Sequence, residues 1–116
     1  MTITSERKTS QIDLQEVQDH DDPERGFWVI VDSYVLDLTK FLRHHPSGAQ
    51  KIVKRRNKSI DIGSNFLDHF AHTVRTFREA CSKHDATGQV VSFRFKEVDQ
   101  YSVSILGKVD PSSLLI

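Results

Sequence analysis

One stretch of the chain, residues 28–45, constrains the fold more than any other because it contains a strong strand-pair pattern. Residues 27–31 are continuously apolar and rich in β-branched side chains, which predicts a buried strand. The next two residues, Asp32 and Ser33, are typical of a turn. A second apolar segment over residues 34–38 resumes the strand pattern. We therefore expect two strands joined by a tight turn.

A short helix is expected after the strand pair. Thr39 is a suitable N-cap for it, and Phe41 and Leu42 are its apolar residues. Pro46 disfavours a helical conformation at the residue before it, so the helix should end there. The stretch thus presents His45 at the end of a short helix, directly before Pro-Ser-Gly.

Hydrophobic periodicity predicts further short elements on either side of this stretch. They are helices over residues 11–19, 49–57 and 61–70, a helix that Thr73 would cap, a break over residues 85–88, and strands over residues 90–95 and 103–106. Ser10 and Asp13 have the spacing of a capping box at the start of the first helix. The helix after Thr73 should bury a stripe of Phe77, Ala80 and Cys81.

Charge is balanced over the chain but unevenly distributed. Lysine plus arginine and aspartate plus glutamate both number 16, while residues 9–24 contain six acidic residues and no lysine or arginine. A basic run follows later, made up of Lys51, Lys54, Arg55, Arg56 and Lys58. We expect both segments to form solvated faces. Nucleic-acid binding is disfavoured because the basic run lacks the interleaved aromatic residues of a stacking platform.

The length of 116 residues predicts one domain. A single cysteine, Cys81, allows no internal disulfide and suits a reducing compartment. The N-terminus lacks the apolar core of a signal peptide, and the apolar residues 114–116 fall far short of the roughly 20 that cross a bilayer. We therefore expect a soluble, cytoplasmic monomer without membrane insertion.

Four of the six histidines fall within 29 residues and frame a hydrophobic segment, which suggests a metal centre. A zinc site could use His69 and His72, but His44 and His45 are adjacent and Cys81 has no partner thiol. Two histidines on opposite sides of a haem are a better arrangement, because bis-histidine iron has no open position and suits electron transfer. The apolar residues available to line such a slot are Leu42, Ile52, Phe66, Leu67 and Phe70.

Several motifs resemble those of the cytochrome b5 family. The strand pair leads into Asp37-Leu-Thr-Lys-Phe and then His45-Pro-Ser-Gly, which is similar to the family's Leu/Val-Thr-x-Phe followed by His-Pro-Gly-Gly. Asn65-Phe66 and His72-Thr73 are similar to the family's Asn-Phe and His-Ser. Further similarity over residues 9–20 and 103–111 extends the resemblance to about nine-tenths of the chain.

The resemblance implies an α+β fold, in which a small mixed β-sheet and short helices form a haem pocket. The haem-binding domain is expected over residues 9–111, between a flexible tail over residues 1–8 and a C-terminal tail over residues 112–116. Residues of about 85–100 have no clear family counterpart and are expected to form an extra hairpin or loop.

The resemblance also assigns roles to individual residues. His45 is the first axial ligand of the iron, and Pro46 and Gly48 form the tight turn that aims its ring. Phe41 is expected behind that ligand. Thr73, like the family's serine, is expected to hydrogen-bond a haem propionate. Ile52 and Phe66 stand at pocket positions of the family.

The second axial ligand is expected to be His72, with His69 as the alternative. His69 lies 24 residues after His45, which is the family's usual separation, whereas His72 lies 27 residues after it. Local context favours His72, because Thr73 follows it and Phe66 precedes it by six residues, close to the family's spacing. The extra length would then lie in the loop around residues 57–63.

Two further features depart from the family. Ser47 replaces a glycine, so the backbone there loses some freedom. The basic run lies where family members that dock basic partners usually show an acidic haem edge. The reversed sign would favour an acidic partner or pair with the haem propionates.

The implied function is one-electron transfer by a bis-histidine haem protein that is not itself an enzyme. No Cys-x-x-Cys-His occurs, so haem b would be held non-covalently. A flavin-containing reductase would supply electrons and a redox acceptor protein would take them. The alternative is a haem-binding module with a regulatory or haem-carrying role.

Overall fold

The strand pair predicted from the sequence forms the centre of the fold. In the computed structural model, residues 11–43, 46–63, 71–94 and 102–114 are described, with backbone alone for residues 46–49, 71–73 and 102. The helices are α1 (Leu14–Asp19), α2 (Thr39–Arg43), α3 (Pro46–Lys58), α5 (Ala71–Thr87) and the 3₁₀ helix η3 (Pro111–Leu114). The strands are β1 (Asp21–Asp22), β2 (Gly26–Val31), β3 (Tyr34–Asp37), β4 (Val91–Arg94) and β5 (Ser102–Lys108). This is the α+β fold expected from the sequence.

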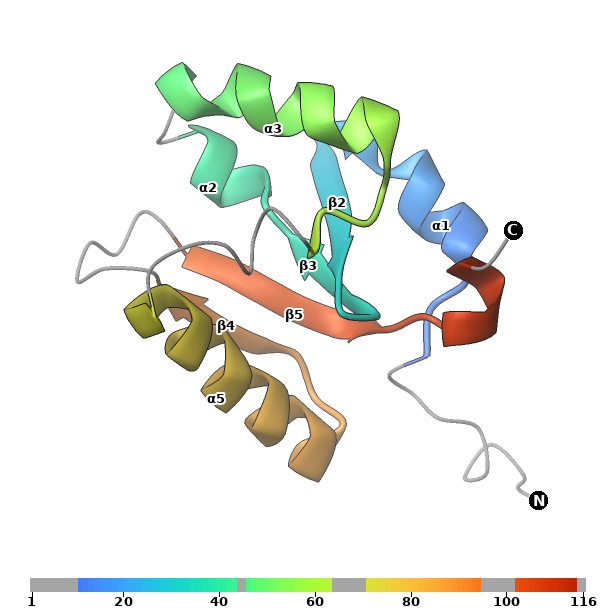
Figure 1. Ribbon diagram of the computed structural model, residues 1–116, viewed down its shortest axis with the longest axis vertical. Coiled ribbons are helices and arrows are strands. Elements are labelled where there is room, and N and C mark those ends of the chain that lie inside the picture. The colour runs from blue at the N-terminus through green and yellow to red at the C-terminus, as the bar shows by residue number, and fades with distance from the viewer. Residues whose placement is uncertain (1–10, 44–45, 64–70, 95–101, 115–116) are drawn as a thin grey trace.

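The five strands form an antiparallel sheet in the order β1-β2-β3-β5-β4 (Figure 1). β2 and β3 pair directly, with Val31 opposite Tyr34, so only two residues make the turn between them. Those residues, Asp32 and Ser33, have φ angles of 54° and 71°. Positive φ at both turn positions matches the right-handed twist of the strands. The predicted strand pair and turn are therefore confirmed.

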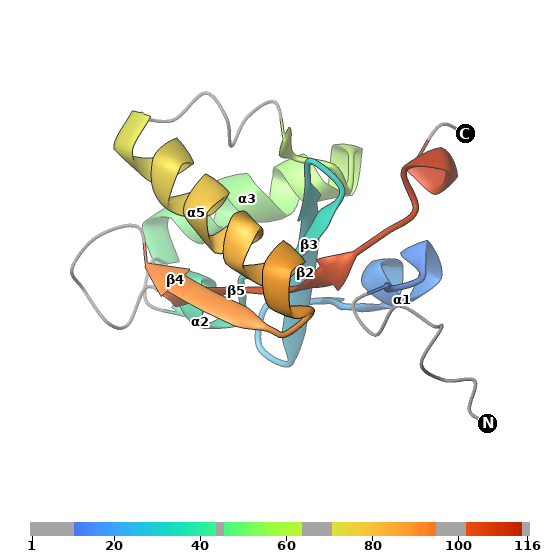
Figure 2. The same cartoon turned by 90° about the horizontal axis from the view of Figure 1, so that it is seen from below.

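Alternate residues of the central strands supply two apolar clusters, one on each face of the sheet. Phe27, Val29 and Leu36 belong to the larger cluster, which continues into α2 and α5. Ile30 and Val35 belong to the smaller cluster, which includes residues of α1 and η3. Figures 1 and 2 show α5 lying along β4 and β5, while α2 and α3 lie beside β2. The helices nearest the predicted histidine ligands thus share one face of the sheet.

The first helix begins later than the sequence predicts. α1 starts at Leu14, with Asp13 as its N-cap, rather than at residue 11. Gln11 instead forms a parallel bridge with Lys108, and the Ile12 N–H donates to the Lys108 carbonyl at 2.8 Å. The start at residue 11 was wrong because this segment pairs with the end of β5.

Thr39 is not the N-cap of α2, contrary to the prediction. It is the first residue of the helix, and its hydroxyl accepts the Phe27 N–H at 2.9 Å. Asp37 makes the local contact at the helix start, because its carboxylate accepts the Thr39 N–H at 2.9 Å. The Leu38 carbonyl then accepts the Leu42 N–H. Thr39 therefore ties α2 to the start of β2.

The long helix α5 also differs at both ends from the prediction. It contains Thr73, which therefore lies within the helix and does not cap it. It continues through the predicted break at residues 85–88 as far as Thr87, and Gly88, with a φ of 71°, ends it by donating to the His84 carbonyl at 2.7 Å. A left-handed glycine is a common helix terminator. The predicted buried stripe is confirmed, and it comprises Phe77, Ala80 and Cys81.

The segment expected to be an insertion contains regular structure where it is described. Its first residues, 85–87, complete α5. β4 follows and pairs antiparallel with β5, with Phe93 opposite Val103. Phe93 is buried in the larger apolar cluster. That the segment over residues 85–100 has no counterpart in other family members remains a prediction.

Arg56 is a buried connector between three elements. Its Nε donates to the Trp28 carbonyl and one terminal nitrogen donates to the Val17 carbonyl, both at 2.7 Å. The same terminal nitrogen lies 3.3 and 3.4 Å from the carbonyl oxygens of His20 and Gln18. Val17 and Gln18 lie near the C-terminus of α1, where the Val17 carbonyl also accepts the His20 N–H at 3.1 Å. Arg56 thus joins α3 to the end of α1 and to β2.

Burial changes the role expected for Arg56. The sequence predicts it on a solvated basic face, but it is only 9% exposed. Burial lowers the pKa of the guanidinium, and the nearby charge of Asp21 partly offsets this effect. The aromatic ring of Phe27 lies 5.4 Å from the guanidinium carbon. Arg56 is therefore part of the packed structure.

Replacing Arg56 should destabilise the fold much more than replacing its neighbour. Arg56→Ala removes a charged donor from the carbonyls of Trp28 and Val17 and leaves a void where the buried side chain packed, so we expect the free energy of unfolding to fall by about 3 kcal/mol. Arg55→Ala removes an exposed cation and should change it by no more than about 0.5 kcal/mol. Urea denaturation followed by circular dichroism measures both values. Equal effects would show that the hydrogen bonds of Arg56 contribute little.

Candidate haem site

The predicted first ligand belongs to the corner between α2 and α3. α2 ends at Arg43 and α3 begins at Pro46, while His44 and His45 lie outside the described residues. Proline suits the first turn of a helix because its missing N–H would have no partner there. Pro46 is the first residue of α3, and that it ends the preceding helix stays a prediction. Gly48 lies in the first turn of α3.

Apolar side chains extend from this corner into the larger cluster. Leu42 of α2 is 4% exposed and lies within the cluster. Phe41 of α2 and Ile52 and Val53 of α3 are half-buried and pack against it. The predicted pocket residues Phe41, Leu42 and Ile52 are therefore brought together on one apolar surface. Val53 is an additional member that the sequence reasoning did not include.

The predicted second ligand, His72, belongs to the beginning of α5. The structure describes the backbone of His72 and Thr73 within this helix. His69, Phe66, Leu67 and Phe70 lie outside the described residues, so their predicted roles stay predictions. Phe77, one turn further along α5, lies in the same cluster as Leu42. The two predicted ligands thus flank elements that share one apolar cluster.

The described residues fit a flat, largely apolar cofactor better than a bare metal ion. Half-buried Phe41 and Ile52 border a cluster whose members are all hydrophobic. In the described part of the chain, no three His, Cys, Asp or Glu side chains gather into a metal-binding group. The apolar lining among the described residues therefore suits a flat, hydrophobic cofactor such as a haem.

His84 is a buried polar residue that the sequence reasoning missed. It is 1% exposed, its Nδ1 lies 2.6 Å from the Gln89 carbonyl oxygen, and its ring meets that of Tyr34 edge-on. Its Nε2 has no hydrogen-bond partner among the described residues. The signal for its burial was its position, because it continues the stripe of Phe77 and Cys81 by a further turn of α5.

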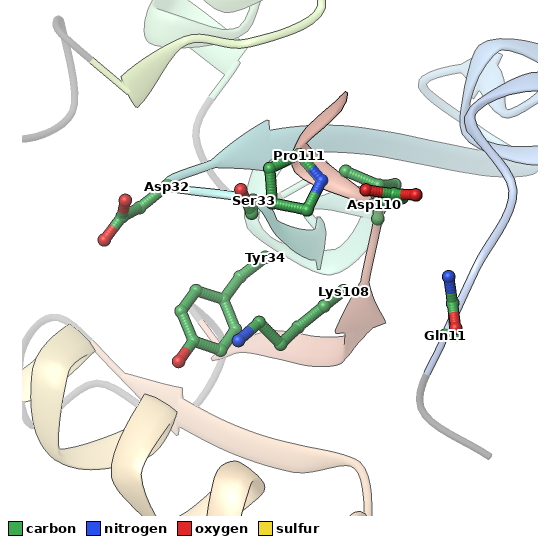
Figure 3. Close-up of a pocket in the computed structure, with 8 residues that line it drawn as sticks. Gln11, Asp32, Ser33, Tyr34, Lys108, Asp110 and Pro111 are labelled. Atoms are coloured by element: carbon green, nitrogen blue, oxygen red, sulfur yellow. The ribbon is translucent and has the colours of Figure 1, made fainter. Parts of the chain in front are cut away.

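A hollow of about 580 Å³ lies beside the turn between β2 and β3, away from the histidine-bearing corner (Figure 3). Its lining includes Asp32, Tyr34 and Lys108. The Tyr34 hydroxyl donates to Asp85 at 2.6 Å, and the Lys108 ammonium lies 4.0 Å from the same carboxylate. Burial, together with this hydrogen bond, raises the pKa of the Tyr34 phenol. Tyr34 and Lys108 already pair with Asp85, so we do not take this hollow as the candidate site.

No helix in the described ranges is both long enough and apolar enough to span a membrane.

The five-stranded sheet and the helices that pack on it define a small α+β domain. The family model for the cytochrome b5-like heme/steroid binding domain matches residues 13–106. The chain therefore belongs to the cytochrome b5 family, whose cofactor is haem b. The match includes β2, β3 and the helices on either side of the candidate site.

Individual relatives agree with this assignment. The chain is 38% identical over 68 residues to cytochrome b5 of Rattus norvegicus, covering 59% of this chain and 48% of that protein. It is 28% identical over 81 residues to a probable Delta(5) fatty acid desaturase C of Dictyostelium discoideum, covering 70% of this chain and 17% of that protein. It is 42% identical over 62 residues to the NADH nitrate reductase of Lotus japonicus, covering 53% of this chain and 6% of that protein. The chain thus spans less than half the length of each of these relatives, which include both an electron carrier and enzymes.

The buried thiol of Cys81 should be unreactive in the folded protein. Burial raises its pKa to about 12, an effect that the charge of Arg78 partly offsets. At pH 8 we therefore expect modification by a disulfide reagent to be at least about 100-fold slower in the folded than in the urea-unfolded protein, since the thiolate is the reactive form. The measurement is the release of the coloured thiol product with time. Comparable rates in the two states would contradict the burial of this side chain.

The raised pKa of the Cys81 thiol should make the free energy of unfolding depend on pH in the alkaline range. An unfolded thiol ionises near its ordinary pKa of 9.0, whereas the folded one stays protonated up to about 12. The corresponding stability is fully present below pH 9 and is lost as the pH rises toward 12. The urea midpoint should therefore fall less steeply between pH 9 and 11 in Cys81→Ala than in the parent. Parallel slopes would contradict this linkage.

Proposed function

We propose that this chain binds haem b non-covalently between His45 and His72 and carries single electrons between a flavin-containing reductase and a redox acceptor protein. When bound, the haem supplies an iron that exchanges one electron at a time. The chain's own residues hold it in place, exclude water from its faces and leave no open position on the metal. The electron carrier among the relatives, cytochrome b5, supports this role at the level of the family.

One observation carries the proposal. The corner that contains His45 and the start of α5, which contains His72, adjoin elements that pack into a single apolar cluster. α2 contributes Leu42 to this cluster and α5 contributes Phe77. A slot between two such helical walls is the setting that two axial ligands on opposite faces of a haem require.

His72 is proposed as the second ligand, in preference to His69. Its backbone belongs to α5, a helix of 17 residues that is anchored on the sheet by its buried stripe. A ligand held by an anchored helix is positioned precisely. Thr73, the next residue of the same helix, is proposed to contact a haem propionate.

Absorption spectra of single variants test the ligand assignment. The purified protein, or the protein after addition of haemin, should show a Soret band and sharp visible bands on reduction with dithionite. His45→Ala and His72→Ala should each abolish the six-coordinate spectrum, because each removes one axial nitrogen. His69→Ala and His44→Ala are the matched controls and should keep it.

Two results would overturn parts of this proposal. A protein that takes up no haemin would exclude the haem-binding role altogether. Loss of the six-coordinate spectrum in His69→Ala, with its retention in His72→Ala, would reassign the second ligand to His69 and leave the electron-carrier proposal intact.

A further inference from the structure

Four exposed cations form a single face of α3. Lys51, Lys54, Arg55 and Lys58 are all exposed, and their spacing of three, one and three residues places them on one side of a helix. We call these four residues the basic face. Between them, Ile52 and Val53 are half-buried against the larger cluster, whereas Arg56 is buried in its hydrogen bonds to α1 and β2. The inward side of α3 is therefore fixed by packing, and the basic face points outward.

The charge of the basic face is not neutralised within the described structure. No ion pair to any of its four residues occurs among the described residues. The basic face borders a hollow of about 570 Å³, and Asp61 is the one acidic residue in the lining of that hollow. The remaining lining residues are Ser59 and Ile62. A concentration of four positive charges with one negative charge creates a local positive potential on a chain whose formal net charge is zero.

The basic face also lies close in sequence to the proposed haem ligand. α3 begins directly after His45, and Lys51 stands at its sixth residue. At about 1.5 Å of rise per residue, Lys51 lies within about 8 Å along the helix axis of its first residue. Figure 1 shows α3 along the outer edge of the molecule, where a partner can approach it.

We infer that the basic face docks an acidic, carboxylate-rich surface of a redox partner protein. This inference rests on the proposed function, because it makes the α2–α3 corner the place where the partner approaches the haem. Long lysine and arginine side chains on a fixed helix attract a negative surface from a distance and raise the rate of encounter.

A protein partner fits the basic face better than nucleic acid does. Single-stranded nucleic acid is held by cations interleaved with aromatic platforms, and the lining of this hollow contains no aromatic residue. The acidic stretch over residues 11–24, with Asp13, Glu16 and Asp19 on or next to α1, would repel a long phosphate backbone. A compact protein partner needs to contact only the basic face and can avoid the acidic stretch.

A charge-reversal experiment tests this inference with a plant-type [2Fe–2S] ferredoxin as an acidic, strongly reducing probe. The haem-loaded full chain is mixed with reduced ferredoxin, and stopped-flow absorbance gives the second-order rate constant of haem reduction as a function of salt. We expect this rate constant to fall with rising salt. Lys54→Glu/Lys58→Glu should lower it about 10-fold at low salt and flatten its salt dependence.

The matched control is Arg78→Glu/Lys83→Glu. It changes the net charge by the same amount at two exposed positions of α5, and should lower the rate constant less than about 2-fold. Equal losses in the two double variants would show an effect of net charge alone and overturn the inference. A reaction in which the reduced chain donates to a basic cytochrome c faster than it accepts from ferredoxin, with a rate unchanged in the Lys54→Glu/Lys58→Glu (α3) variant, would place docking on another face and would also overturn it.

A second readout does not depend on electron transfer. Binding of the chain to immobilised ferredoxin, with and without haem, should weaken at least about 5-fold in the α3 variant but not in the control. Intact binding by a chain that takes up no haem would preserve this inference while the proposed function fails. Two other results would overturn the inference. Tighter binding to a single-stranded oligonucleotide than to ferredoxin would make nucleic acid the occupant of the basic face. Self-association in sedimentation that the α3 variant abolishes would make a second copy of the chain the occupant.

Discussion

The hydrogen bonds of Arg56 fix the position of α3, and the candidate site depends on that position. The side chain donates to the carbonyls of Val17 and Trp28, so α3, α1 and β2 are held together at one point. The segment after α3 is held as well, because the Ile62 N–H donates to the Ile30 carbonyl of β2. With its C-terminal half fixed in this way, α3 can present Ile52 to the apolar cluster next to the histidine-bearing corner.

The sequence predicted best those features that local chemistry decides. The β2–β3 pair follows from apolar runs and a two-residue turn, and the stripe of α5 follows from helical periodicity. Helix ends were predicted less well because distant groups decide them. Gln11 is extended because it pairs with Lys108, and the Thr39 hydroxyl accepts from Phe27 instead of capping α2. These partners are remote in sequence, so no local pattern predicts them.

The predictions for the candidate site also differ according to whether local or distant residues decide them. The motif around His45 is local, and the structure places its apolar neighbours Phe41 and Leu42 at one apolar cluster. The second ligand depends on how the chain returns to the opposite side of that cluster, and spacing alone leaves two histidines in competition. Sequence reasoning also treated Arg56 as one more solvated cation, because burial of a charge is decided by carbonyls on other elements.

The period of an α-helix explains how one short basic run can have two roles. Arg55 and Arg56 are adjacent, yet successive residues differ by about 100° around the helix axis, so one is exposed and the other is buried. The buried arginine sets the rotation of α3, and that rotation in turn directs Lys51, Lys54 and Lys58 outward together. Replacing Arg56 would therefore disturb the direction of the basic face as well as the stability of the fold. The surface charge of this protein is thus positioned by a charge in its interior, which the formal net charge of zero does not reveal.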